Sequence, residues 1–405
     1  MTLLLWIKAE ILFSVISVPT YNITKTSTNN TIMESDKDLL LEILRKGQTY
    51  AKQKNYQEAV SMYRMTADHG YAPGQFALGQ CYYLGNGVQQ DYTEAVKWFS
   101  KAAEQGNPVG QHFLGVCYDF GRGVPQNYEE AVKWYKESAE KGYELAQFNL
   151  ANCYRYGRGV QQNMTEAARW YMNAALREHV EAQFNLGMFF SKGAGVLQNY
   201  AEAVKWYRKA AEHGHAKAQC MLGLLYNEGK GVAQDYAEAV KWLSISAEKD
   251  EFNALGPLGN MYWNGIGVAK DYSKALHYFT LAAKRGDYIA QCNLGIMYYR
   301  GDGIEKDIDK AAQWMLLAAQ KGSQTAVDNL KIIKNEMEEG TWRHTFKSLA
   351  RKMVGSMVGD AVGKEIEEAI DGKLGELLGE VAGEAISKVI EPNSNKSPDH
   401  NKTVQ

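Results

Sequence analysis

The stretch "GRGVPQNYEEAVKWY", Gly121 to Tyr135, places a glycine-rich loop directly before a helix-like segment. Phosphate-binding loops have glycines in a similar position, but they follow a strand and place a glycine at the start of the helix. Here another helix-like segment precedes Gly121, and the expected helix cap, Asn127, comes four residues after Gly123. The stretch therefore predicts a turn between two helices, with both glycines at positive φ.

The paired glycines of this stretch belong to an internal repeat. The G-x-G pair occurs seven times at a constant spacing of 36 residues, and a leucine and an aromatic residue recur in the same register. A fixed period of this length is typical of solenoids, in which each unit buries its apolar face against its neighbours. The pairs are Gly85/Gly87, Gly121/Gly123, Gly157/Gly159, Gly193/Gly195, Gly229/Gly231, Gly265/Gly267 and Gly301/Gly303.

Each unit reads as two helices. The first, for example residues 110–118, carries leucine and small residues at helical spacing, and a glycine where we expect another backbone to come close. The second begins at an Asn or Asp cap such as Asn127, followed three residues later by Glu130 in a capping-box pattern. It ends in most units at a glycine suited to the left-handed conformation. The recurrent tryptophans, such as Trp206, are expected to be core residues.

Composition excludes several functional classes. The 405 residues carry a formal net charge of -2, so no overall field attracts nucleic acid or anionic lipid. Five cysteines without C-x-x-C spacing predict neither a disulfide framework nor a zinc site, and they favour a reducing, cytoplasmic compartment. Histidines show no ligand spacing, and we predict no cofactor and no metal.

The repeated pattern A-Q-x-x-L-G-x-x-Y-x-x-G-x-G-V-x-x-[DN]-Y-x-x-A-x-x-W, followed from Ala146 to Trp170, resembles the Sel-one-like repeat, a relative of the tetratricopeptide repeat. The resemblance covers Gly70 to about Leu330. It implies an all-α, right-handed α/α solenoid and a non-enzymatic scaffold or adaptor. The expected partner is a protein or peptide, held in a concave groove that the first helices line.

Candidate groove positions are the variable first-helix residues on either side of the Leu-Gly pair. Asparagine interleaved with aromatic residues suits an extended peptide, because an amide bonds a peptide backbone in both directions. The alternative is that these are ordinary packing or solvated positions. The candidates are Phe76, Phe148, Asn149, Asn152, Arg155, Tyr156, Phe184, Asn185, Asn260, Trp263, Asn293 and Tyr299.

An enzymatic alternative comes from two S-x-x-K matches, Ser138 to Lys141 and Ser246 to Lys249. A cysteine-rich subgroup of the resembled family is linked to penicillin binding or weak β-lactamase activity. No S-D-N or K-T-G motif accompanies the two matches. We therefore expect a chain without enzymatic activity and keep a penicillin-binding or weak β-lactamase-like hydrolase as the alternative.

The ends of the chain differ from its middle. Residues 1–35 are apolar and then polar, which fits a signal, an anchor or a mis-assigned start. A secreted or membrane-anchored chain is therefore an alternative to a cytoplasmic one. Residues 36–70 resemble a tetratricopeptide-like cap. Residues 71–330 hold the seven repeats and the start of a last helix. Residues 331–391 predict an amphipathic glycine-rich helical hairpin that caps the last repeat, self-associates or contacts a membrane surface, and residues 392–405 predict a disordered tail. The glycine seams are Gly355, Gly359, Gly363, Gly375, Gly379 and Gly383.

Overall fold

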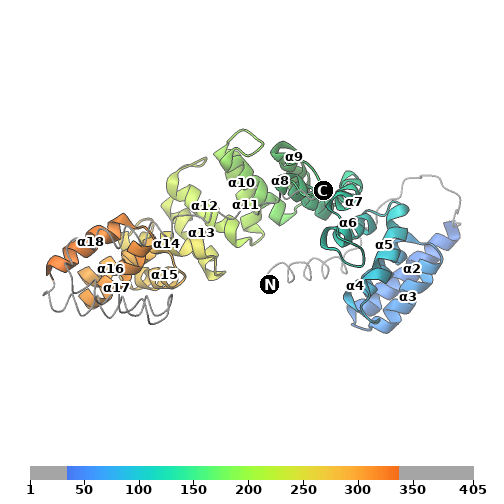
Figure 1. Ribbon diagram of the computed structural model, residues 1–405, viewed down its shortest axis with the longest axis horizontal. Helices are drawn as coiled ribbons and strands as arrows, with labels where there is room; N and C mark the ends of the chain where they lie inside the picture. The colour runs from blue at the N-terminus through green and yellow to red at the C-terminus, as the bar shows by residue number, and fades with distance from the viewer. Residues whose placement is uncertain (1–33, 337–405) are drawn as a thin grey trace, which may run out of the picture. The chain divides into compact units, whose positions relative to one another are not determined.

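The structure is a computed structural model that describes residues 34–336 (Figure 1). Within this range the chain forms 17 helices and no strand. The apolar N-terminal run, the polar tail and the glycine seams from Gly355 to Gly383 lie outside the described residues, so the sequence predictions for them stay predictions. None of the described helices is long and apolar enough to cross a membrane.

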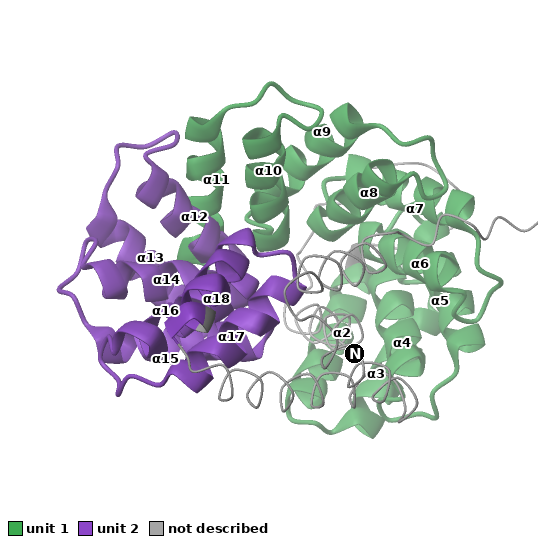
Figure 2. Cartoon of the chain, turned by 60° about the vertical axis from the view of Figure 1, so that its left-hand side comes forward, with its two compact units in different colours: residues 1–213 green, residues 214–405 purple. Residues whose placement is uncertain are grey.

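The chain divides into two compact units at residue 213, coloured separately in Figure 2. Each unit is built from consecutive helix pairs. The helices of unit 1 are α2 (Glu34–Lys52), α3 (Tyr56–Asp68), α4 (Ala72–Leu84), α5 (Tyr92–Glu104), α6 (Pro108–Phe120), α7 (Tyr128–Glu140), α8 (Glu144–Tyr156), α9 (Met164–Ala175), α10 (Val180–Lys192) and α11 (Tyr200–Glu212). Those of unit 2 are α12 (Ala216–Glu228), α13 (Tyr236–Glu248), α14 (Phe252–Asn264), α15 (Tyr272–Lys284), α16 (Tyr288–Arg300), α17 (Ile308–Gln320) and α18 (Gln324–Glu336).

Helix packing within each unit follows the repeat. Each first helix packs against the second helix of its own pair, and that second helix packs against the first helix of the next pair. First helices also contact one another, α4 with α6 and α12 with α14, whereas no second helices make a comparable contact in the described part of the chain. The predicted all-α solenoid of helix pairs is confirmed, and the first helices lie closest together in it.

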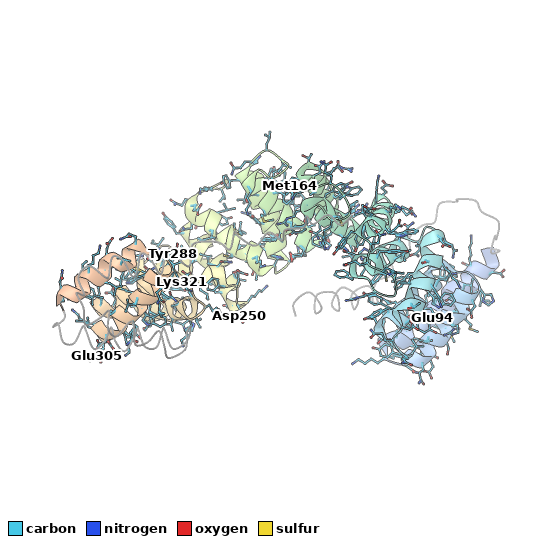
Figure 3. All side chains as sticks on the ribbon, viewed as in Figure 1. Glu94, Met164, Asp250, Tyr288, Glu305 and Lys321 are labelled. Atoms are coloured by element: carbon cyan, nitrogen blue, oxygen red, sulfur yellow. The ribbon has the colours of Figure 1, made fainter. Side chains whose placement is uncertain are left out.

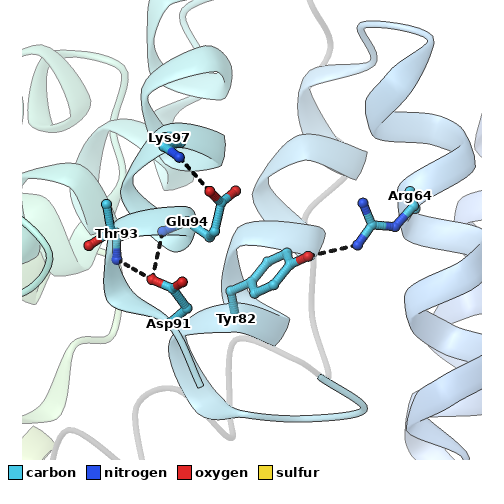
Figure 4. A network of polar contacts seen from close by, with 6 residues as sticks. All are labelled: Arg64, Tyr82, Asp91, Thr93, Glu94 and Lys97. Atoms are coloured by element: carbon cyan, nitrogen blue, oxygen red, sulfur yellow. Dashed lines mark hydrogen bonds and ion pairs between the residues drawn. The ribbon is translucent and has the colours of Figure 1, made fainter. Parts of the chain in front are cut away.

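The second helices begin at the predicted Asn and Asp caps, as Figure 4 shows for α5. Asp91 Oδ1 accepts hydrogen bonds from the backbone N–H groups of Thr93, at 2.9 Å, and Glu94, at 3.0 Å. The Glu94 carboxylate does not complete the capping box, because it pairs with Lys97 one turn later. The backbone N–H of Asp91 instead donates to the carbonyl of Tyr82 in α4. Each cap therefore also fastens its helix to the preceding one.

The two glycines of each G-x-G loop have different structural roles. Gly157 ends α8 in the left-handed conformation, with φ of 67°, and its N–H donates to the carbonyl of Cys153. Gly159 also has positive φ, but its α-carbon lies against the carbonyl of Tyr128 at the start of α7, where no β-carbon would fit. The prediction of positive φ at both glycines is confirmed. The second glycine also permits contact between consecutive repeats.

The core of each repeat differs in one respect from the sequence prediction. The glycine after most repeat leucines lets the second helix of the same repeat come close, as predicted: a β-carbon on Gly115 would lie 2.7 Å from the Tyr135 ring and 3.2 Å from the Ala131 carbonyl oxygen. The residue after each tryptophan is the fully buried one, Tyr135 after Trp134 and Tyr207 after Trp206. Trp206 itself is buried, whereas Trp134 is half-buried, so the prediction of a tryptophan core holds only in part.

Candidate protein-binding surface

Two of the aromatic groove candidates lie in the core. Phe76 is 2% exposed and packs between the rings of Phe99 and Phe113, at centroid distances of 5.9 and 5.3 Å. Phe148 is 5% exposed and stacks on His179 at 4.5 Å. These two rings are closed to a partner, which corrects their placement among the groove residues. The error arose because the position two residues before the repeat leucine faces the next helix pair.

The remaining candidates of unit 1 include a contiguous polar and aromatic cluster. Arg155 Nη1 donates to Asn185 Oδ1 at 3.0 Å, and the Arg155 guanidinium lies 4.9 Å from the centre of the Tyr156 ring. Tyr156 is 57% exposed, which is unusual for a ring of this size in a packed repeat. The structure thus brings Arg155, Tyr156 and Asn185 together from the neighbouring first helices α8 and α10.

Three other candidates of unit 1 are partly buried beside this cluster. Asn152 Oδ1 accepts a hydrogen bond from the Tyr171 hydroxyl at 2.5 Å. Phe184 packs against Tyr207 with ring centres 5.8 Å apart. Asn149 is half-buried on α8. The first two therefore support packing between the helices of their own repeats.

The candidates of unit 2 are engaged in separate polar contacts. Trp263 Nε1 donates to Asp302 Oδ2 at 2.9 Å, and Asn260 Oδ1 accepts from Asn264 Nδ2 at 2.6 Å. Tyr299 donates its hydroxyl to Glu336. Asn293, also in unit 2, is half-buried. None of the contacts found among the described residues joins these four candidates to one another.

The sequence analysis missed three residues of the unit 1 surface. Arg122 and Arg158 occupy the middle position of two consecutive G-x-G loops, and Phe120 stands directly before the first loop. The Arg122 guanidinium lies 5.5 Å from the Phe120 ring, and its Nη1 donates to the Tyr83 hydroxyl. Phe120 is 38% exposed. The signal was present in the letters "FGRG" and "YGRG", because an aromatic and an arginine flank the same glycine in both repeats.

A buried carboxylate lies behind these arginines. Asp119, at the end of α6, is 6% exposed and accepts a hydrogen bond from the Tyr135 hydroxyl at 3.1 Å. Arg158 Nη1 lies 3.7 Å from Asp119 Oδ1, an ion pair without a hydrogen bond. Burial raises the pKa of Asp119, and Arg158 and the Tyr135 bond oppose that rise only in part. Asp119 therefore faces one of the two arginines, Arg158.

The serines of the S-x-x-K matches are structural. Ser138 and Ser246 are fully buried, and their hydroxyls donate to the carbonyls of Pro108, at 2.6 Å, and Ala216, at 2.8 Å. Lys141, which completes the first match, donates to the carbonyl of Gly106 at 2.8 Å. Each S-x-x-K segment thus fastens one repeat to the preceding one. This arrangement leaves neither serine hydroxyl accessible to an acyl substrate.

The cysteines and histidines form no reactive site among the described residues. All five cysteines are buried free thiols, as predicted, and burial raises the pKa of Cys81, Cys117, Cys153 and Cys220 to about 12. Residues 34–336 contain no group of three or more His, Cys, Asp or Glu side chains placed to hold a metal ion.

The repeat pattern and the paired-helix packing define the class of protein, a helical-repeat solenoid, and comparison with known proteins identifies its family. The Sel1 repeat model matches residues 42–71, 72–107, 108–143, 145–179, 180–215, 216–251, 253–287 and 289–323. The chain belongs to the Sel1 repeat family. Proteins with such repeats are generally non-catalytic scaffolds that bind other proteins.

Two solved structures illustrate the similarity. One is c5321, a protective antigen present in uropathogenic Escherichia coli strains, with 28% identity and a TM-score of 0.58 over 92% of this chain and 82% of that chain. Another is a Sel1 repeat protein from Oxalobacter formigenes, with 36% identity and a TM-score of 0.51 over 62% of this chain and 98% of that chain. Comparison with curated proteins gives no match.

Proposed function

We propose that this chain is a non-enzymatic scaffold that binds a peptide or protein partner on the first-helix face of unit 1. The observation that carries the proposal is the cluster of Arg155, Tyr156 and Asn185, which two neighbouring first helices hold together. A half-exposed arginine and an exposed tyrosine are the residue types that dominate binding energy in protein interfaces. Asn149, half-buried on α8, lies on the same helix as Arg155 and Tyr156.

The physical basis of the proposal is the cost of leaving Tyr156 in water. A ring that is 57% exposed gains little from folding, but it gains from a partner that covers it. The Arg155–Asn185 bond and the contact with Tyr156 restrict the arginine before a partner arrives, which lowers the entropy lost on binding. An enzymatic role lacks such support, because both candidate serines are buried and engaged.

A site-specific photo-crosslinker tests this proposal. Benzoylphenylalanine at Tyr156 of the full chain should give a covalent adduct with a partner, and the same group at Lys136, exposed on the second helix α7, should not. Arg155→Ala should reduce the yield at Tyr156. Equal yields at both positions, or no adduct at Tyr156 while Lys136 is labelled, would contradict the proposal.

A further inference from the structure

Three arginines lie beside Phe120 and Tyr156, two of the exposed aromatic residues of unit 1, and we call these five residues the arginine–aromatic patch. Arg155 and Arg158 lie 4.9 and 5.9 Å from the centre of the Tyr156 ring, and Arg122 lies 5.5 Å from that of Phe120. The five residues come from the C-terminal ends of α6 and α8 and the loops that follow them. Phe120 and Tyr156 hold equivalent positions in consecutive repeats, as do Arg122 and Arg158, so the patch belongs to two adjacent repeats.

The charge of this patch is unbalanced among the described residues. Arg122 bonds to the neutral hydroxyl of Tyr83 and Arg155 to the neutral amide of Asn185. Within residues 34–336, Asp119 is the carboxylate found in an ion pair with the patch, and it pairs with Arg158 alone. Five cations on the second helices differ, since each of them has an acidic neighbour one turn away. These pairs are Lys97 with Glu94, Lys133 with Glu130, Arg169 with Glu166, Lys205 with Glu202 and Lys241 with Glu238.

Aromatic contacts hold the guanidinium groups in place while leaving them hydrogen-bonding capacity. Arg122 is near three rings, those of Tyr83 at 5.4 Å, Tyr92 at 5.7 Å and Phe120 at 5.5 Å. A guanidinium stacked on a ring still presents its N–H edges, and two parallel N–H groups match the two oxygens of a carboxylate.

We propose that the arginine–aromatic patch binds an acidic peptide segment in which Asp or Glu residues alternate with an aromatic or large apolar residue. This inference rests on the proposed function and names the chemistry of the partner. Carboxylates on the segment pair with Arg122 and Arg155, and its apolar side chain covers Phe120 or Tyr156. The carboxylates of the segment supply negative charge to Arg122 and Arg155, which contact only neutral groups among the described residues.

Nucleic acid and anionic lipid fit the patch less well. Both need a cationic stripe or surface longer than two repeats. The middle position of the neighbouring loops is Asn86 on one side and Ala194 on the other, so the equivalent cations stop after two units. The net charge of the whole chain, -2, also provides no long-range attraction for a polyanion.

Fluorescence anisotropy with the full chain tests the inference. The probe is a fluorescein-labelled peptide of alternating Glu and Phe residues, and its comparison is a Gln-Phe peptide of the same length. We expect the Glu-Phe peptide to bind at least about tenfold more tightly, and added salt to reduce the difference. Equal binding of the two peptides would overturn the inference.

A matched pair of variants assigns the binding to the patch. Arg122→Gln with Arg155→Gln removes two cations that have no acidic partner among the described residues, and Lys97→Gln with Lys133→Gln removes two cations from the second helices α5 and α7. Both double variants change the net charge equally. The arginine variant should weaken binding at least about tenfold and the lysine variant less than about twofold. Equal effects would overturn the inference.

A replacement variant and two control ligands help to interpret the binding measurements. If the arginine variant unfolds, Tyr156→Ala replaces it, because this exposed ring can be truncated without opening the core. Phosphatidylserine vesicles and a single-stranded oligonucleotide report general anion binding, and equal patch-dependent binding of either one would overturn the choice of an acidic peptide. An adduct at Tyr156 that persists in the arginine variant, without competition by the Glu-Phe peptide, would contradict this inference while leaving the proposed function intact.

Discussion

Gly159 lies so close to Tyr128 of the preceding repeat that a β-carbon on the glycine would overlap the tyrosine's backbone carbonyl oxygen. The same relationship joins Gly123 to Tyr92 and Gly195 to Met164, which Figure 3 labels at the start of α9. The second glycine of each G-x-G loop is therefore a packing residue. The first glycine only ends a helix.

This difference predicts unequal effects of two alanine substitutions. Gly157→Ala should cost about 1–2 kcal/mol of unfolding free energy, because alanine is strained at a φ of 67° and its β-carbon meets nothing closer than Gln162 at 3.4 Å. Gly159→Ala should cost at least about 1 kcal/mol more, because the Tyr128 carbonyl must also move. Urea unfolding measures both, and equal costs would show that the close contact is unimportant.

Truncating a buried tryptophan tests the repeat core. Trp206 is 7% exposed, and Lys209 lies over its ring at 4.7 Å. Trp206→Ala should cost roughly 3–5 kcal/mol, the usual loss for a large buried aromatic. Trp134→Ala, at the half-buried equivalent position, should cost clearly less. A loss well below about 1 kcal/mol at Trp206 would mean that the ring is exposed in solution.

A strained helix end predicts a stabilising substitution. Glu178 occupies the turn where most repeats have glycine, and it adopts a φ of 66°. Glu178→Gly should raise the unfolding free energy by about 1 kcal/mol, because glycine adopts positive φ without strain. The matched control is Gly70→Ala, where a β-carbon would meet nothing within 4 Å and the φ of 76° alone should cost a similar amount. Destabilisation by Glu178→Gly would indicate that the glutamate side chain contributes a favourable contact.

A buried histidine predicts how stability depends on pH. Burial lowers the pKa of His112 to about 3, His179 adds to the effect, and His112 Nδ1 has no hydrogen-bond partner. The unfolded chain binds this proton below about pH 6.5, so folding stability is present above that pH and falls as the solution is acidified toward pH 3. The loss should approach about 1.4 kcal/mol per pH unit.

The variant His112→Phe isolates this contribution. Sister repeats carry Phe76, Phe148 and Phe184 at the equivalent position, so a phenyl ring should fit. The unfolding free energy of the variant relative to the parent should rise steadily between about pH 6.5 and pH 4 as acid is added. Parallel pH profiles for parent and variant would show that His112 does not titrate on unfolding.

The glycine seams beyond the described residues lead to a prediction from sequence alone. Gly359→Leu with Gly379→Leu should abolish self-association or membrane recruitment, because leucine prevents close approach of helices at such seams. The thermal unfolding midpoint of the repeats should hardly change, because solenoid units are stabilised mainly by their neighbours. Light scattering and liposome sedimentation compare the variant, the parent and a chain truncated after Leu330. A parent that is monomeric and does not bind lipid would contradict the prediction.

Much of the fold follows from local chemistry that is legible in the sequence. Positive φ at Gly157 and Gly159 and the cap at Asn127 depend on the preferences of single residues, so a 36-residue repeat was enough to predict helix pairs and their ends. The same reasoning predicted buried free thiols. Repetition strengthened these predictions, because each structural element was tested seven times in one chain.

The tertiary structure decided which side of each helix became core and which became surface. Trp134 and Tyr135 are adjacent in sequence, and only the packing of Tyr135 on Gly115 makes the tyrosine the buried residue. Likewise, Phe148 is enclosed by the next helix pair, whereas Tyr156 on the same helix α8 is left in solvent. The grouping of Arg122, Arg155 and Arg158 around two exposed rings depends on how consecutive repeats stack. The preferences of single residues do not determine that stacking.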